Sequence, residues 1–186
     1  MDNIGERYKD KLTKQLGISV EEAELLFNQY HERVPFIRGL RDSASRTGAN
    51  RGYVKTILGR KCRFNLYEPF DRRETPLPIE KAMDEYGGRL KRAYTYKAMN
   101  RLIQGSAADM TKKAMLNLYK EGFIAHTQVH DELNISVRDK KECEKVVEIM
   151  RNCVELKVPN KVDAELGENW GDVRDYEDYF NEKNRS

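Results

Sequence analysis

The sequence predicts an α+β fold, and three features of its 186 residues carry that prediction. Helical patterns dominate residues 6–47. Residues 52–64 and 123–137 each have the composition of a β-hairpin, with β-forming residues on both sides of a turn. A long amphipathic helix is expected within residues 79–121. We therefore expect three parts: a helical segment at 1–50, a sheet-bearing part packed by long helices at 51–172, and a polar acidic tail at 173–186.

The helical segment has clear start and stop signals. Residues 6–16 are compatible with a helix, and Gly17 is expected to end it as a C-terminal cap. Ser19 followed by Glu22 forms the pattern of a capping box, which predicts that the next helix begins there. Pro35 should interrupt that second helix.

A change of periodicity follows the helical segment. A short third helix is expected at about 36–47, ended by Gly48. The β-rich residues on both sides of Leu58 and Gly59 then predict a hairpin. The stretch 65–78 holds three of the five prolines in the chain and is expected to be an irregular loop.

The charge is distributed unevenly along the chain, although the net charge is only +3. Residues 33–63 carry nine basic side chains against Asp42 alone, whereas residues 163–182 carry eight acidic side chains against Arg174 alone. The basic side chains of the hairpin could simply be a solvated strand edge. Their density favours contact with phosphates, so we expect this segment to face a polyanion.

The long helix is expected to have a core face. Its apolar residues recur at steps of three and four. Asn100 and Gln104 share another face of the helix, next to small residues such as Gly105. Amide side chains next to small residues, which let another molecule come close to the helix, match the donor and acceptor groups of a nucleic-acid minor groove. Tight packing of this helix against a sheet is the alternative, and both can hold at once. The core face comprises Met99, Ile103, Ala107, Met110, Ala114 and Leu118.

The hairpin at 123–137 is the place where the sequence predicts chemistry. We expect its turn to hold Asp131 and Glu132, between strands that begin near Phe123 and continue through Val137. Adjacent carboxylates on a stiff scaffold are ligands for a divalent metal that handles phosphate oxygens. On spacing alone, a solvated turn is the commoner explanation of such a pair.

The remaining features are structural. Asp139 is expected to cap an amphipathic helix, residues 161–166 are expected to form a strand, and the last ten or so residues are expected to fray. Three cysteines without metal-binding spacing indicate a reduced, cytoplasmic protein. The sequence has no apolar run near the ~20 residues of a membrane span, and it begins without the pattern of a signal peptide. No membrane association is expected.

Five stretches, taken together and in this order, resemble the C-terminal part of the family A DNA polymerases, which include bacterial DNA polymerase I and many phage enzymes. They cover roughly residues 5–172, and the resemblance implies a polymerase palm with an N-terminal helical part from the fingers. We expect a phage origin. The stretches are Leu16-Gly17-Ile18-Ser19, Gly52-Tyr53-Val54-Lys55-Thr56 with Gly59-Arg60, Ile103-Gln104-Gly105-Ser106-Ala107-Ala108-Asp109, Gln128-Val129-His130-Asp131-Glu132, and Gly167-Glu168-Asn169-Trp170.

The resemblance implies roles for individual residues. Asp131 corresponds to the palm aspartate of motif C that coordinates two Mg²⁺ ions, and Glu132 to a carboxylate that assists less directly. The residues expected to contact primer-template DNA are His130, Gln104, Asn100, Arg60 and, from the basic segment, Lys55. One position departs from the pattern: Tyr96 stands eight residues before Gln104, where bacterial members often have Arg.

Two family elements do not occur in these residues. The Asp-x-Ser-x-Ile-Glu type of motif A supplies the other metal-binding aspartate, and a fingers helix ending in Phe-Gly-x-x-Tyr-Gly holds the dNTP. We therefore expect a split polymerase that is active only with a separate N-terminal polypeptide. We also expect exposed apolar surface, and poor solubility or oligomerisation of the isolated chain.

Two other functions fit parts of the sequence. A non-catalytic remnant could bind duplex DNA through the basic segment 33–63. A His-Asp phosphohydrolase is suggested by His130 and Asp131, but such sites gather several His and Asp residues on helices, and this chain has three histidines in all.

Overall fold

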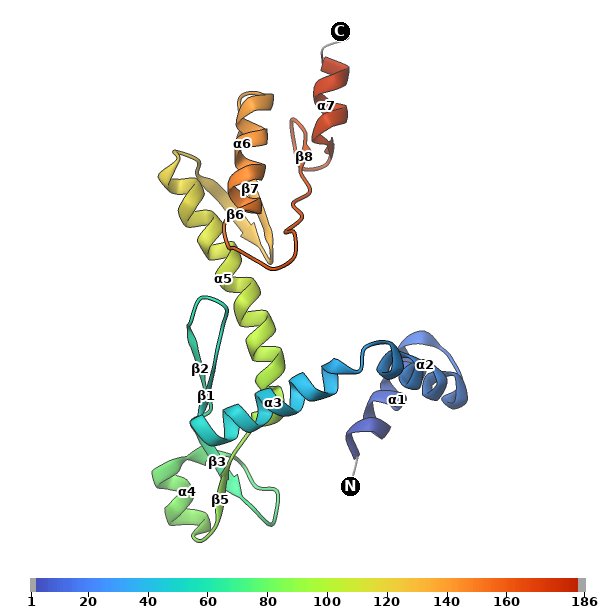
Figure 1. Cartoon of the computed structure of the whole chain (residues 1–186), viewed down its shortest axis with the longest axis vertical. Coiled ribbons are helices and arrows are strands. Elements are labelled where there is room, and N and C mark those ends of the chain that lie inside the picture. Colours follow the sequence, from blue (N-terminus) through green and yellow to red (C-terminus); the bar gives the residue numbers. More distant parts are fainter. Residues whose placement is uncertain (1–2, 184–186) are drawn as a thin grey trace. The chain divides into compact units, whose positions relative to one another are not determined.

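The computed structural model describes residues 3–183 of the chain, which fold as two compact units. The first unit contains residues up to 54 together with 61–101, and the second contains 55–60 together with the residues from 102 onward. Most elements of both are labelled in Figure 1.

Three helices open the first unit: α1 (Asn3–Leu16), α2 (Val20–Arg33) and α3 (Phe36–Arg51). The predicted capping box is present, with the Glu22 amide donating to Ser19 Oγ over 3.1 Å and the Ser19 amide donating to Glu22 Oε2 over 2.9 Å. The predicted end of α3 at Gly48 was wrong. Gly48 lies inside the helix and is buried, where a Cβ atom would come within 3.0 Å of the Phe64 ring. The helix ends instead at Gly52, whose φ of 76° requires the left-handed conformation.

Replacement of Gly52 by alanine should destabilise the fold in two ways, through the backbone conformation and through a clash with Arg92. Gly52→Ala should lower the free energy of unfolding by about 2 to 3 kcal/mol, since the left-handed conformation alone costs about 1 to 2 kcal/mol with a Cβ atom. The added Cβ would also lie 2.8 Å from Cζ of Arg92, whose guanidinium donates to the Phe64 carbonyl over 2.9 Å. Gly17→Ala is the matched control, because Gly17 has a φ of 65° and open space around it. Urea unfolding of both variants measures the difference, and equal losses would contradict the role of Arg92.

Short strands complete the first unit. β1 (Tyr53–Lys55) pairs with β2 (Lys61–Arg63), which confirms the predicted hairpin. The prediction of an irregular loop at 65–78 was wrong, because that stretch contains β3 (Leu66–Pro69) and β4 (Leu77–Pro78). With β5 (Leu90–Arg92) they form an antiparallel sheet in the order β4-β3-β5. Helix α4 (Ile79–Tyr86) lies between β4 and β5 in the sequence.

The long helix α5 (Ala98–Lys120) follows a single 3-10 turn at Thr95–Lys97. The predicted core face is buried in the C-terminal half of the helix, at Ala114 and Leu118. In the N-terminal half the prediction was wrong, because Ile103 and Ala107 are exposed. The helix lies in the first unit up to Arg101 and in the second from Leu102 onward.

The second unit continues with a hairpin, a helix and a short sheet. β6 (Ala125–Val129) and β7 (Glu132–Ile135) form the hairpin, and α6 (Lys140–Arg151) begins with Asp139 as its cap, as predicted. The predicted strand at 161–166 is reduced to β8 (Glu165–Leu166), which pairs with β9 (Arg174–Asp175). The expected fraying of the last residues was wrong for Tyr176–Lys183, which form helix α7. Buried apolar residues of this unit are Ala114, Leu118, Cys143, Val146, Val147 and Cys153.

Large apolar side chains are exposed in both units. In the first unit Leu25 is 58% and Phe36 66% exposed. In the second unit Tyr119 and Ile124 are also exposed. Among the helices of residues 3–183, none combines the length and apolar composition that a bilayer crossing requires.

Candidate metal and nucleic-acid site

The hairpin β6–β7 has a two-residue turn at its tip. Val129 pairs with Glu132, so the turn consists of His130 and Asp131. The prediction that Asp131 and Glu132 would share the turn was therefore wrong by one residue, because Glu132 is the first residue of β7. His130 has a φ of 53°, as expected at the first position of the tight turns that match the twist of paired strands. Histidine is among the residues that tolerate this conformation best after glycine.

Side-chain hydrogen bonds hold the two strands of the hairpin in register. Close to the tip, Gln128 Nε2 donates to the His130 carbonyl over 3.0 Å. Farther from it, Asn134 Nδ2 donates to Thr127 Oγ1 over 2.8 Å across the strands. The register shifts at the start of β6, between Ala125 and Thr127. The tip is thus carried by paired backbone and local hydrogen bonds on both sides of the turn.

Both carboxylates at the tip are exposed. Within residues 3–183, Asp131 and Glu132 have no hydrogen bond or ion pair to another side chain. An exposed carboxylate without a cationic partner keeps its oxygens available to a hard divalent cation. No group of three or more His, Cys, Asp or Glu side chains that could hold a metal occurs in the described part of the chain. The two residues therefore fit part of a Mg²⁺ site, whose octahedral shell needs further oxygen ligands.

Arg60 takes part in a network around the loop that connects β1 to β2. Its Nε donates to Asp109 Oδ1 over 2.7 Å, and its Nη2 donates to the Gly105 carbonyl over 2.9 Å. Both partners lie on α5, within the second unit. A hydrogen bond from the Thr56 hydroxyl and the Arg60 guanidinium hold the pKa of the Asp109 carboxyl below its ordinary value, whereas burial acts to raise it. Asp109 is therefore an ionised, buried partner of Arg60.

Asp109 is a functional candidate to which the sequence alone assigned no role. Asp109 stands in a stretch of small residues on α5, and its side chain is only 7% exposed. An aspartate among small residues of a helix is a weak signal, because its partner Arg60 lies 49 residues earlier in the chain. Only the fold brings the two together.

The other predicted DNA contacts lie on exposed positions. Asn100 and Gln104 are both exposed on α5, four residues apart, and Lys55 is exposed at the end of β1. The hydrogen bonds and ion pairs of the described residues do not connect any of these three to the tip of the hairpin. Their common role stays a prediction from sequence.

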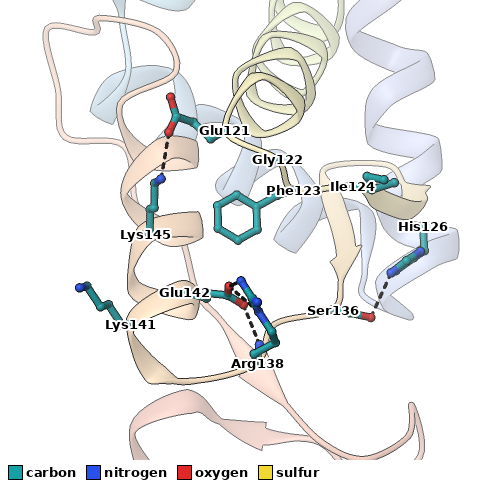
Figure 2. Close-up of a pocket in the computed structure, with 10 residues that line it drawn as sticks. All are labelled: Glu121, Gly122, Phe123, Ile124, His126, Ser136, Arg138, Lys141, Glu142 and Lys145. Carbon is teal, nitrogen blue, oxygen red and sulfur yellow. Dashed lines mark hydrogen bonds and ion pairs between the residues drawn. The ribbon is translucent and has the colours of Figure 1, made fainter.

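A shallow depression lies at the base of the hairpin, away from its tip. Figure 2 shows Phe123 pointing into it, between two ion pairs, Lys145 with Glu121 and Arg138 with Glu142. His126 contributes Nε2, which lies 3.0 Å from Ser136 Oγ. None of the predicted metal or DNA residues lines this depression, so it does not form part of the candidate site.

The chain is similar in sequence to known proteins. A family model described as "DNA polymerase family A" matches residues 7–172. The chain is 35% identical to a DNA-directed DNA polymerase of Pseudomonas phage M6 over 90% of its own length and 22% of that protein. It is 31% identical to DNA polymerase I of Pseudomonas aeruginosa over 87% of its length and 17% of that protein.

A solved structure agrees with the sequence relatives. The POL domain of Pol1 from M. smegmatis, in complex with DNA primer-template and dNTP, superimposes with a TM-score of 0.58 at 31% sequence identity. The similarity covers 80% of this chain and 25% of that one. The chain thus spans about a fifth of the length of the curated relatives named above. Because the family model covers most of its residues, this chain belongs to DNA polymerase family A.

Proposed function

We propose that this chain contributes motif C to a DNA-directed DNA polymerase that transfers nucleotides to a primer 3′-hydroxyl. The observation that carries the proposal is the placement of Asp131, exposed and without an ion pair at the two-residue tip of a paired hairpin. Membership of the polymerase family and the likeness to a polymerase domain bound to primer-template and dNTP support it. We expect the enzyme to work in the cytoplasm, of the host cell if it is phage-encoded.

The proposed chemistry assigns separate tasks to the two carboxylates. When bound, a pair of Mg²⁺ ions would activate the attacking oxygen and stabilise the leaving pyrophosphate. Asp131 would hold metal through its carboxylate oxygens, and the rigid turn would fix where those oxygens stand. Glu132, the first residue of β7, would assist the geometry less directly, as the resemblance to the family implies.

The duplex would be held by polar and basic side chains. Asn100 and Gln104 present amides, which can donate and accept in the minor groove. His130 stands beside Asp131 in the turn and would contact the primer end. Arg60 and Lys55 would contact the duplex from the loop between β1 and β2 and from the end of β1.

Catalysis would further require polymerase elements outside residues 1–186. Asp131 and Glu132 do not complete a Mg²⁺ shell, and Mg²⁺ gives up its waters reluctantly, so a site with so few protein ligands binds the ion weakly. We propose that these elements supply the second metal-binding aspartate and the cationic groups that hold the dNTP phosphates.

Reconstitution tests this proposal. The chain is mixed with a polypeptide that carries motif A and the fingers helix, and extension of a labelled primer is measured with Mg²⁺ and the four dNTPs. We expect extension with both polypeptides and Mg²⁺, and none when either polypeptide or the metal is omitted. Extension by the chain alone at a comparable rate would refute the need for polymerase elements outside residues 1–186. Stable binding of duplex DNA by a mixture that never extends a primer would favour a non-catalytic DNA-binding remnant.

A further inference from the structure

We propose that Asp109 is a positioning residue, which holds the Arg60 guanidinium next to Gln104 so that both meet a bound duplex as one preformed surface. This inference rests on the proposed function, because it takes Arg60 and Gln104 as duplex contacts. It adds a residue to which the sequence gave no role.

The exposure of the two side chains supports these roles, with Arg60 contacting the duplex and Asp109 positioning Arg60. The Arg60 side chain is 48% exposed, whereas the Asp109 side chain is 7% exposed. Asp109 is therefore too deeply buried to contact a duplex itself and must act through its partner. The second hydrogen bond of the guanidinium, from Nη2 to the carbonyl of Gly105, fixes it to the backbone of the residue that follows Gln104.

The backbone that carries Arg60 is fastened to the same helix. Thr56 and Arg60 close the loop with two hydrogen bonds, from the Thr56 amide to the Arg60 carbonyl over 2.9 Å and from the Arg60 amide to Thr56 Oγ1 over 3.0 Å. The Ile57 amide donates to Ser106 Oγ over 3.0 Å, and that hydroxyl donates in turn to the Leu102 carbonyl over 2.6 Å. Residues 55–60 consequently belong to the same compact unit as this part of α5.

Such fixation matters for binding because arginine is long and flexible. A side chain that is already held in one rotamer loses less conformational freedom when it contacts DNA. The fork of the guanidinium allows it to bind a carboxylate on one edge while presenting other N–H groups elsewhere. An ionised Asp109 would otherwise repel phosphates, and its pairing with Arg60 offsets that charge.

The test combines a structural and a functional measurement on the full chain. In the first, the side-chain Nε–H signal of Arg60 is followed by NMR in the wild type, in Asp109→Ala and in the control Glu121→Gln. Glu121 follows the last residue of α5 and pairs with Lys145 over 2.9 Å, so its loss removes a more exposed ion pair elsewhere in the unit. We expect the Arg60 signal to be protected from exchange in the wild type and the control, and to be lost in Asp109→Ala. Unchanged protection in Asp109→Ala would overturn the positioning role.

The second measurement is a double-mutant cycle on the affinity for a primed duplex. We expect Arg60→Ala and Asp109→Ala each to weaken binding about tenfold, and the double variant to be no weaker than Arg60→Ala alone. Arg60→Lys keeps the charge but loses the fork, and we expect a loss of about threefold. Asp109→Asn keeps an acceptor of similar shape and should lose less than Asp109→Ala, which separates positioning from a failure to fold.

Each outcome has one meaning. Multiplicative losses of about a hundredfold in the double variant would show that the two residues act independently, and this would overturn the inference. An effect of Arg60→Ala without any effect of Asp109→Ala would overturn it as well. Equal affinity of wild type and Arg60→Ala would remove Arg60 from the duplex contacts, which defeats the proposed function at this residue and the inference with it. The NMR signal then shows separately whether Asp109 holds Arg60.

Discussion

Replacement of Asp131 by asparagine is expected to reduce the rate of primer extension by the reconstituted polymerase about a thousandfold or more, because an amide cannot supply a charged oxygen to a divalent cation. Asn has nearly the same shape as Asp, and the side chain is exposed at the turn, so the fold should not change. Single-turnover extension of a labelled primer at saturating Mg²⁺ and dNTP measures the chemical step.

The control for Asp131→Asn is Asp163→Asn. Asp163 is also exposed, and its ion pair among the described residues is with Lys161, over 2.8 Å, in a salt bridge whose two side chains are more than three-quarters exposed. Surface pairs of this kind contribute little, so we expect wild-type extension from this variant. Extension by Asp131→Asn at the rate of the control would remove Asp131 from the catalytic site.

The largest expected effect on stability is at Leu118. Among the described residues, Leu118 is the largest side chain that is fully buried. Leu118→Ala should lower the free energy of unfolding by about 3 kcal/mol, which combines the lost transfer free energy with the cost of the cavity. Urea denaturation followed by circular dichroism measures the shift of the midpoint.

Leu116→Ala is the matched control for Leu118. Leu116 lies on the same helix two residues earlier and is 47% exposed. We expect a loss of less than about 1 kcal/mol, since its removal leaves no closed cavity. Equal losses at the two positions would mean that α5 does not bury its Leu118 face against the rest of its unit.

Local sequence rules predicted the elements that local interactions determine. The capping box at Ser19 and Glu22 needs only the four residues that form it, and it is present. The end of α3 could not be predicted in this way. Gly48 and Gly52 both resemble helix terminators, and only packing against Phe64 shows that Gly48 belongs inside the helix.

The short strands show the same limit. β3 and β4 contain Pro69 and Pro78, which argue against strands in general but are tolerated at strand ends and sheet edges. Their pairing with each other and with β5 depends on residues that are distant in sequence. The composition of residues 65–78 therefore indicates a loop, whereas the sheet forms from long-range contacts.

The candidate site was predictable in part for similar reasons. The hairpin and its exposed Asp131 follow from alternating apolar residues within a single stretch. The error of one residue in the turn arose because Glu132 pairs with Val129 and so becomes part of β7. Asp109 was missed because its ion pair with Arg60 exists only once the loop before β2 packs on α5.

The most direct test of the account is metal rescue at the tip of the hairpin. In the reconstituted polymerase, Asp131→Cys replaces a hard oxygen ligand with a soft thiolate, which binds Mg²⁺ poorly and softer divalent ions such as Cd²⁺ well. If Asp131 holds the catalytic metal, primer extension by Asp131→Cys should be lost with Mg²⁺ and partly restored by Cd²⁺, while the wild type gains nothing from Cd²⁺. Undiminished extension by Asp131→Cys with Mg²⁺ alone would contradict metal binding at Asp131.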